Sequence, residues 1–120
     1  MESNNKHFNS LLQLFLPPEL FEYFEIILIG SEGKEVHVHL DELNIKPDVF
    51  AKEKLISKGF HAAVIIHDFP IPDKDMFLHV RRRRWMVESS CQVISRDWDT
   101  VAKGTRLTKG FAAFLKGILG

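Results

Sequence analysis

The segment MFLHVRRRRWMV, residues 76–87, decides how this sequence folds. Its apolar ends have the composition of a β-strand, but four consecutive arginines stand in its middle: Arg81, Arg82, Arg83 and Arg84. Side chains of a strand alternate between two faces, so two of these arginines are in line with the core whichever face is buried. Either the strand therefore runs past the core, or these cations have partners.

The rest of the chain has the length and composition of one small domain. The 120 residues are 45% hydrophobic and include 10 Phe, which suffices for a modest core. Residues 1–7 are polar, and we expect them to form a disordered tail. Residues 8–120 are then expected to fold as a single domain.

The sequence carries no targeting signal that we recognise. No apolar run approaches the roughly 20 residues that span a membrane. The N-terminus MESNNKHFNS lacks the basic start and apolar core of a signal peptide. A single cysteine, Cys91, excludes an internal disulfide. These features predict a cytoplasmic protein without a membrane partner.

Charge is unevenly distributed along the chain. Residues 1–56 contain 5 Lys against 10 Asp and Glu, whereas residues 57–120 contain 5 Lys and 6 Arg against 6 Asp and Glu, so the halves carry −5 and +5. One interpretation is a polyanionic partner on the basic side. The other is that the two halves neutralise each other across the fold.

Hydrophobic periodicity and turn residues predict an α+β fold. The expected elements are helices at 11–16 and 18–24, a β-hairpin at 25–43, a loop with a short helical turn at 46–60, strands at 62–69, 76–87 and 92–98, a connection at 100–107 and a helix at 108–119. We expect the last three strands to form a three-stranded antiparallel unit, and Thr108 to cap the C-terminal helix. The apolar segment 11–24 is either a core helix or a docking surface for a second copy or a partner.

No pattern indicates an enzyme or a metal centre. His37 and His39 lie two apart on a predicted strand, which is possible ligand spacing but is more typical of a polar strand face. Cys91 has no neighbouring base in the sequence. Asp68 and Asp97 flank the arginine strand and are the expected partners of its cations. The sequence therefore predicts no catalytic residue, no metal and no cofactor.

The basic residues of the second half indicate nucleic-acid binding instead. The candidate DNA-binding residues are Arg81, Arg82, Arg83, Arg84, Trp85, Arg96, Lys103, Arg106 and Lys109. Guanidinium groups make forked hydrogen bonds to phosphate and to guanine, and a two-stranded β-ribbon fits the DNA major groove. The competing interpretation is an edge strand whose charges prevent aggregation.

Residues 57–116 resemble a known protein family in three features. A DFP turn precedes the strand, the arginine segment ends in Trp85, and TRLT opens a helix before FAAFL. This arrangement resembles the N-terminal region of bacterial insertion-sequence transposases of the ISL type, in particular the Aon-type group. The resemblance implies transposition, a form of DNA recombination, with binding to the inverted-repeat ends of a mobile element. It places the protein in the cytoplasm, associated with the nucleoid when it is bound to DNA.

The chain departs from that family in its cysteines and in its length. The resemblance implies a zinc ribbon with two Cys pairs, but only Cys91 is present, so we expect a metal-free, zinc-ribbon-like unit. The chain is also too short for a complete helix-turn-helix and a catalytic domain. We therefore expect a non-catalytic module that binds double-stranded DNA. The alternative is an assembly module that self-associates or docks onto a catalytic transposase subunit through residues 11–24.

A specific hypothesis follows for the arginine strand. Its first part, residues 77–80, packs in the core, and one pair of arginines, either Arg81 with Arg83 or Arg82 with Arg84, faces phosphates. The other pair is neutralised by Asp68 and Asp97. The ring of Trp85 covers the arginine stems.

Overall fold

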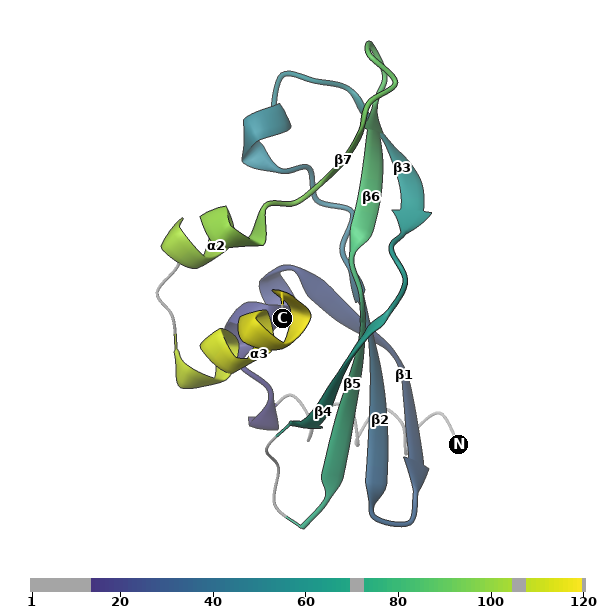
Figure 1. Ribbon diagram of the computed structural model, residues 1–120, viewed down its shortest axis with the longest axis vertical. Coiled ribbons are helices and arrows are strands. Elements are labelled where there is room, and N and C mark those ends of the chain that lie inside the picture. The colour runs from purple at the N-terminus through teal and green to yellow at the C-terminus, as the bar shows by residue number, and fades with distance from the viewer. Residues whose placement is uncertain (1–13, 70–72, 105–107, 120) are drawn as a thin grey trace.

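The computed structural model describes residues 14–69, 73–104 and 108–119, apart from the side chain of Asp68. Two β-sheets follow each other along an elongated molecule, and the helices gather on one side of them (Figure 1). The predicted α+β class is confirmed. No helix in these ranges is long and apolar enough to cross a membrane.

The large sheet has the strand order β1-β2-β5-β4. Its strands are β1 (Phe24–Glu32), β2 (Glu35–Glu42), β4 (Val64–Phe69) and β5 (Asp75–Arg81). The predicted hairpin is confirmed as the antiparallel pair of β1 and β2, and its turn uses Gly33 at φ 61°. β2 runs parallel to β5, and β4 runs antiparallel to β5.

The small sheet has the strand order β3-β6-β7, all antiparallel. Its strands are β3 (Leu55–Phe60), β6 (Arg83–Val87) and β7 (Val93–Ser95). The two antiparallel pairings expected among 62–69, 76–87 and 92–98 are confirmed, as β4 with β5 and β6 with β7, but they belong to different sheets because residues 76–87 serve both. The zinc-ribbon-like arrangement is not confirmed. Strand β3 lies where we expected a loop. Its alternating pattern was not recognisable because a bulge, at which Gly59 adopts φ 77°, interrupts it.

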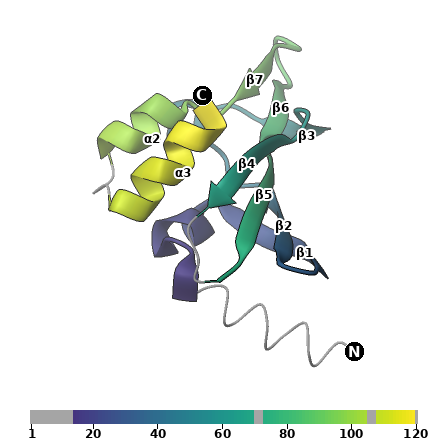
Figure 2. The ribbon, with the colours of Figure 1, turned by 60° about the horizontal axis from the view of Figure 1, so that its bottom comes forward.

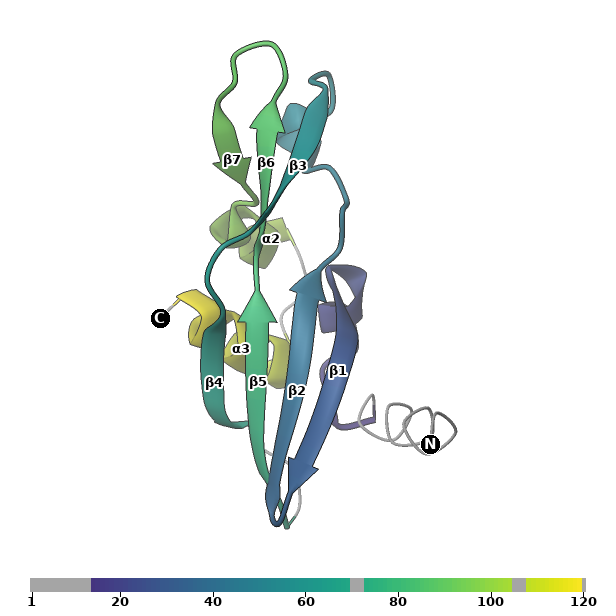
Figure 3. The ribbon, with the colours of Figure 1, turned by 90° about the vertical axis from the view of Figure 1, so that its right-hand side faces the viewer.

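The arginine segment lies where one sheet passes into the other. Buried side chains stand at even positions in β5 and at odd positions in β6: Met76, Leu78 and Val80, then Trp85 and Val87. Only Arg82 separates the two strands. In Figure 3 the β3–β4 segment crosses over β5–β6, so that its strands lie on opposite sides of them. The ribbon thus turns about its own axis, and the buried face changes from even to odd positions.

The helices close the core of the large sheet. The described helical elements are η1 (Pro18–Glu22), η2 (Asp48–Phe50), α2 (Trp98–Gly104) and α3 (Lys109–Leu119). Figure 2 shows α3 across one face of this sheet with α2 beside it. The core is formed by Leu16, which precedes η1, and by buried side chains of η1, the strands, α2 and α3: Leu20, Phe24, Val36, Val38, Leu40, Phe69, Met76, Leu78, Val80, Trp98, Phe111, Phe114, Leu115 and Ile118.

The helix predictions are partly confirmed. Thr108 caps α3 as expected, since its hydroxyl accepts a hydrogen bond from the backbone N–H of Phe111 at 3.2 Å. The predicted helix at 18–24 is a 3₁₀ turn, η1. Much of the expected connection at 100–107 is instead helix α2. The tail at 1–7 and most of the first predicted helix lie outside the described residues.

Candidate nucleic-acid interface

The four arginines separate by parity onto two sides of the twisted ribbon. Arg81 donates from Nε and Nη2 to the two carboxylate oxygens of Asp41, at 2.7 and 2.6 Å. Arg83 donates from Nη1 to the hydroxyl of Ser57 at 2.6 Å and from Nε to the carbonyl of Glu42 at 3.1 Å. Both guanidinium groups lie over the ring of Phe60. The odd-numbered arginines are therefore bound within the chain.

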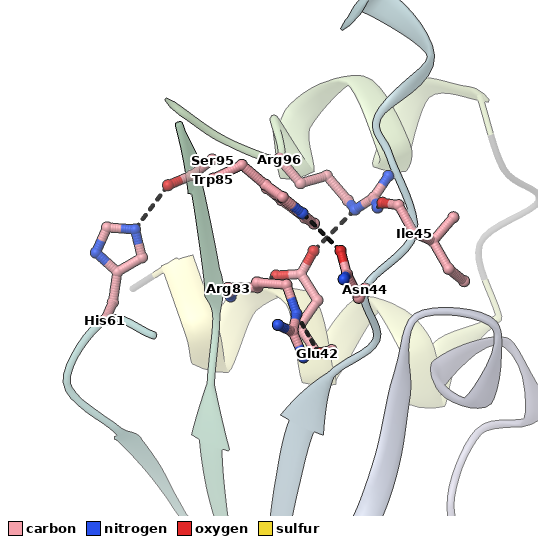
Figure 4. Close-up of polar contacts among 8 residues, drawn as sticks. All are labelled: Glu42, Asn44, Ile45, His61, Arg83, Trp85, Ser95 and Arg96. Carbon is pink, nitrogen blue, oxygen red and sulfur yellow. Dashed lines mark hydrogen bonds and ion pairs between the residues drawn. The ribbon is translucent and has the colours of Figure 1, made fainter. Parts of the chain in front are cut away.

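A buried carboxylate, Glu42, joins the two sheets (Figure 4). Its side chain is 1% exposed, and it accepts hydrogen bonds from the backbone N–H of Arg83 at 2.9 Å and from Nε of Arg96 at 3.0 Å. Arg96 also donates to the carbonyl of Ile45. Burial raises the pKa of Glu42, while the hydrogen bonds from Arg83 and Arg96 act in the opposite direction.

Two predicted site residues belong to this buried junction. Trp85 is 1% exposed, and its indole N–H donates to the side-chain oxygen of Asn44 at 2.9 Å. The guanidinium of Arg96 lies 5.1 Å from the ring centroid of Tyr23 and 5.8 Å from that of Trp85. The ring of Trp85 thus covers an arginine, but this arginine is Arg96. These contacts hold the small sheet against the large sheet and α2.

The expected carboxylate partners are corrected by these contacts. Asp41 and Glu42, at the end of β2, neutralise the arginines instead of Asp97. Asp97 accepts hydrogen bonds from the backbone of Asp99 and from Thr100, so it caps the start of α2. These hydrogen bonds lower the pKa of Asp97. The side chain of Asp68 lies outside the described residues.

The small sheet presents a basic and apolar face on the side opposite Trp85. Antiparallel registers place Ile56 and Val93 beside Met86, and Ser95 beside Arg84. Strand alternation adds a lysine, and we call the resulting set the outer face: Ile56, Lys58, Arg84, Met86, Val93 and Ser95. None of the six is acidic. Ile56 and Val93 are 40% and 52% exposed, so an apolar row lies next to the cations.

His61 and Arg82 adjoin this outer face. The backbone N–H of His61 donates to the carbonyl of Arg82 at 2.8 Å, and Nε2 of His61 lies 2.6 Å from the hydroxyl of Ser95. Figure 4 shows this contact on one side of β6 and the Glu42 junction on the other. Burial lowers the pKa of His61, and the charges of Arg82 and Arg84 lower it further. Lys58 and His61 were absent from the predicted site because β3 and its pairing were not recognised, and Ser95 was absent because the predicted set contained only basic residues and Trp85.

The remaining predicted residues do not join this face. Lys103 and Lys109 are exposed on α2 and α3, which pack on the inner side of the sheets (Figure 1). Arg106 lies outside the described residues. The even-numbered arginines are therefore the part of the predicted set that the structure gathers with Lys58 and His61.

A second polar cluster stands on the exposed face of the large sheet. Nε2 of His37 lies 3.0 Å from the carboxylate of Glu35, and Nδ1 of His37 lies 2.8 Å from Nε2 of His79. The ring of His39 stacks on that of His79 at 4.3 Å. Burial and the neighbouring histidines lower the pKa of His79. No group of three potential ligands in the described ranges is arranged to hold a metal ion.

One concave region of about 310 Å³ lies beside α2. Tyr23, Val49, Arg96 and Thr100 are among its lining residues. Two polar groups of this lining already have partners within the chain, since the guanidinium of Arg96 is bound to Glu42 and the carboxylate of Asp97 caps α2.

Comparisons of the chain with protein-family models, with curated protein sequences and with solved structures find no match. Its function is therefore inferred from its own residues and their geometry.

Proposed function

We propose that this chain is a non-catalytic DNA-binding module of an insertion-sequence transposase, which recognises the inverted-repeat ends of its element. The outer face of the small sheet is the contact surface. The observation that carries the proposal is the division of the arginines. Arg81 and Arg96 are paired with the carboxylates of Asp41 and Glu42, and Arg83 is held by Ser57 and the carbonyl of Glu42. In contrast, no salt bridge among the described residues involves Arg82 or Arg84, and Arg84 donates only to the carbonyl of Lys58.

The shape and chemistry of the outer face suit a DNA groove. The major groove is about 12 Å wide and admits a two-stranded β-ribbon. Strands β6 and β7 of the small sheet form such an antiparallel pair, and their turn projects at one end of the molecule (Figure 3). Arg84 and Lys58 are exposed there to meet phosphates or guanine edges. Ile56, Met86 and Val93 provide apolar atoms that suit thymine methyl groups.

An assembly module remains the second candidate, and a different observation favours it. Leu14 and Phe15, at the start of the described chain, are 78% and 47% exposed. Ile27 and Leu28 on β1 are 48% and 60% exposed, and β1 is an edge strand of the large sheet. Exposed apolar edges favour pairing with another chain. This candidate predicts a molecular mass that rises with concentration and little affinity for DNA.

Fluorescence anisotropy with a mixed-sequence duplex tests the DNA proposal. We expect binding that weakens with salt, with a log–log slope of about −0.9 for each phosphate neutralised. The double variant Arg84→Ala/Lys58→Ala is expected to weaken binding and to reduce the magnitude of the slope by about 2.

The matched control is Lys34→Ala/Lys74→Ala, which removes the same charge from the opposite end of the molecule. Both lysines are exposed, next to the β1–β2 turn and before β5. We expect this control to retain most of the affinity and the salt slope. Equal losses in the two double variants, or no binding of the wild type at low salt, contradict the proposal. If the wild type does not bind DNA even at low salt, a molecular mass that rises with concentration would favour the assembly module, and a constant mass would contradict it.

A further inference from the structure

A set of hydrogen-bond donors converges where β3–β4 crosses β5–β6. His61 is fixed there by its backbone bond to Arg82 and by the contact between its ring and Ser95. Arg84 stands directly opposite Ser95 in the register of β6 and β7. Lys58 lies on the same face, and its carbonyl accepts a hydrogen bond from Nη2 of Arg84 at 3.3 Å.

One donor at this point has no acceptor. Nε of Arg82 is buried and makes no hydrogen bond to the described part of the chain. A buried donor without an acceptor is unfavourable. Arg82 as a whole is half-buried, so part of its side chain stays open to solvent, where an oxyanion can reach it and supply an anionic partner.

We infer that Arg82, Arg84, His61 and Ser95 form a binding site for one phosphate group, and that His61 takes up a proton when the phosphate enters. This inference rests on the proposed function, because it names the contact through which the outer face holds nucleic acid. The phosphate is either part of the DNA backbone or free in solution, since the two share the same oxyanion chemistry.

Proton uptake follows from the charges around His61. The charged groups facing it are Arg82 from the β5–β6 junction and Arg84 from β6, while β7 contributes the neutral Ser95. Burial and the two arginines lower its pKa in the free protein. A phosphate placed among these cations offsets their repulsion and accepts a hydrogen bond from the imidazolium, which raises the pKa again.

Linkage gives the sign of the effect on binding. If the complex binds one proton more than the free protein, its affinity must increase as the pH falls, by at most about tenfold per pH unit. The increase begins as the pH drops below the pKa of His61 in the complex, and it ends below its pKa in the free protein. The site is thus a pH-dependent phosphate contact within the outer face.

The test measures the dissociation constant of the full chain for the same duplex between about pH 8 and about pH 6 at fixed ionic strength. We expect the wild-type affinity to increase several-fold toward the lower pH. His61→Gln keeps a hydrogen-bonding side chain but cannot be protonated, so its affinity is expected to change much less. His39→Gln, on the exposed face of the large sheet, is the matched control and should follow the wild type.

A second measurement reports on His61 directly. The NMR titration of its imidazole is recorded alone, with saturating duplex and with inorganic phosphate. A higher pKa with both ligands supports a general phosphate site, and a higher pKa with duplex alone supports a backbone phosphate. An unchanged pKa in both, or a pH dependence of binding that survives in His61→Gln, overturns the inference while duplex binding itself stands. Absence of duplex binding at every pH overturns both this inference and the proposed function.

Discussion

The two neighbouring carboxylates at the end of β2 provide a matched test of how the sheets are joined. We predict that Glu42→Ala destabilises the protein far more than Asp41→Ala, although each removes the carboxylate partner of one guanidinium group; Glu42→Ala also removes the acceptor of the Arg83 backbone N–H. Glu42 and Arg96 have side chains that are 1% and 9% exposed, whereas Arg81, the partner of Asp41, is 45% exposed. Solvent can replace Asp41 around Arg81 but has little access to the buried contact between Arg96 and Glu42.

The expected magnitudes follow from this difference in burial. Removing one partner of a buried ion pair costs about 3–5 kcal/mol, because the other charge stays buried without compensation. Removing one partner of a partly exposed pair costs about 0–1 kcal/mol. A domain of this size has a free energy of unfolding of about 5–15 kcal/mol, so Glu42→Ala should still fold but with a much lower denaturation midpoint.

Urea denaturation followed by tryptophan fluorescence measures both variants. Trp85 and Trp98 are 1% and 3% exposed and both lie near Arg96, so they report on this junction. A double-mutant cycle with Arg96→Ala isolates the pair, and we expect the double variant to cost about 1–3 kcal/mol less than the sum of the two single variants. Equal losses for Glu42→Ala and Asp41→Ala, or independent effects in the cycle, would refute the reasoning.

Three further predictions concern packing, capping and protonation. A Cβ added at Gly117 in α3 would lie 2.7 Å from Cδ1 of Ile66, so we expect Gly117→Ala to lower the free energy of unfolding, measured in urea, by about 1–2 kcal/mol. Gly104→Ala is the control, because a Cβ added there meets no atom within 4 Å. Equal changes in the free energy of unfolding for the two variants would contradict the prediction. Thr108→Ala removes the cap of α3 and should cost about 1 kcal/mol, while Thr108→Ser should cost much less, as thermal denaturation will show. His79 has a pKa below the usual 6.5 in the folded protein, so the unfolded chain binds more protons, and the free energy of unfolding should fall as the pH drops from about 7.5 toward 5.5. His61 contributes in the same direction, so His79→Gln should reduce this pH dependence but not abolish it. An unchanged pH dependence in His79→Gln would contradict the assignment of this effect to His79.

Local sequence patterns predicted the elements whose structure depends on near neighbours. The hairpin was recognisable from its apolar runs around Gly33, and α3 from its apolar stripe behind Thr108. Strand β3 was missed because none of its six residues is fully buried and the bulge at Gly59 breaks its alternation. Helix α2 was missed because its seven residues include a single buried side chain, Trp98, and so show no apolar stripe.

The candidate site was harder to predict because its partners come from distant parts of the chain. The segment of four arginines indicated that two would be paired and two would not. The identity of the pairs depends on the parallel alignment of β2 with β5, which places Asp41 opposite Arg81 across 40 residues of sequence. Lys58 and His61 reach the site only through the crossing of β3–β4. Neither arrangement leaves a local signal in the sequence.

The continuity of β5 and β6 also determines which changes of chain length this protein can accept. Most insertions in proteins are absorbed by loops, but only one residue, Arg82, separates these two strands. Because side chains alternate with a period of two, adding or deleting one residue here would turn every side chain of β6 to the opposite face. Trp85 would then point to solvent and Arg84 to the interior. A change of two residues would keep both faces in place, so length variation at this junction should be tolerated only in even steps.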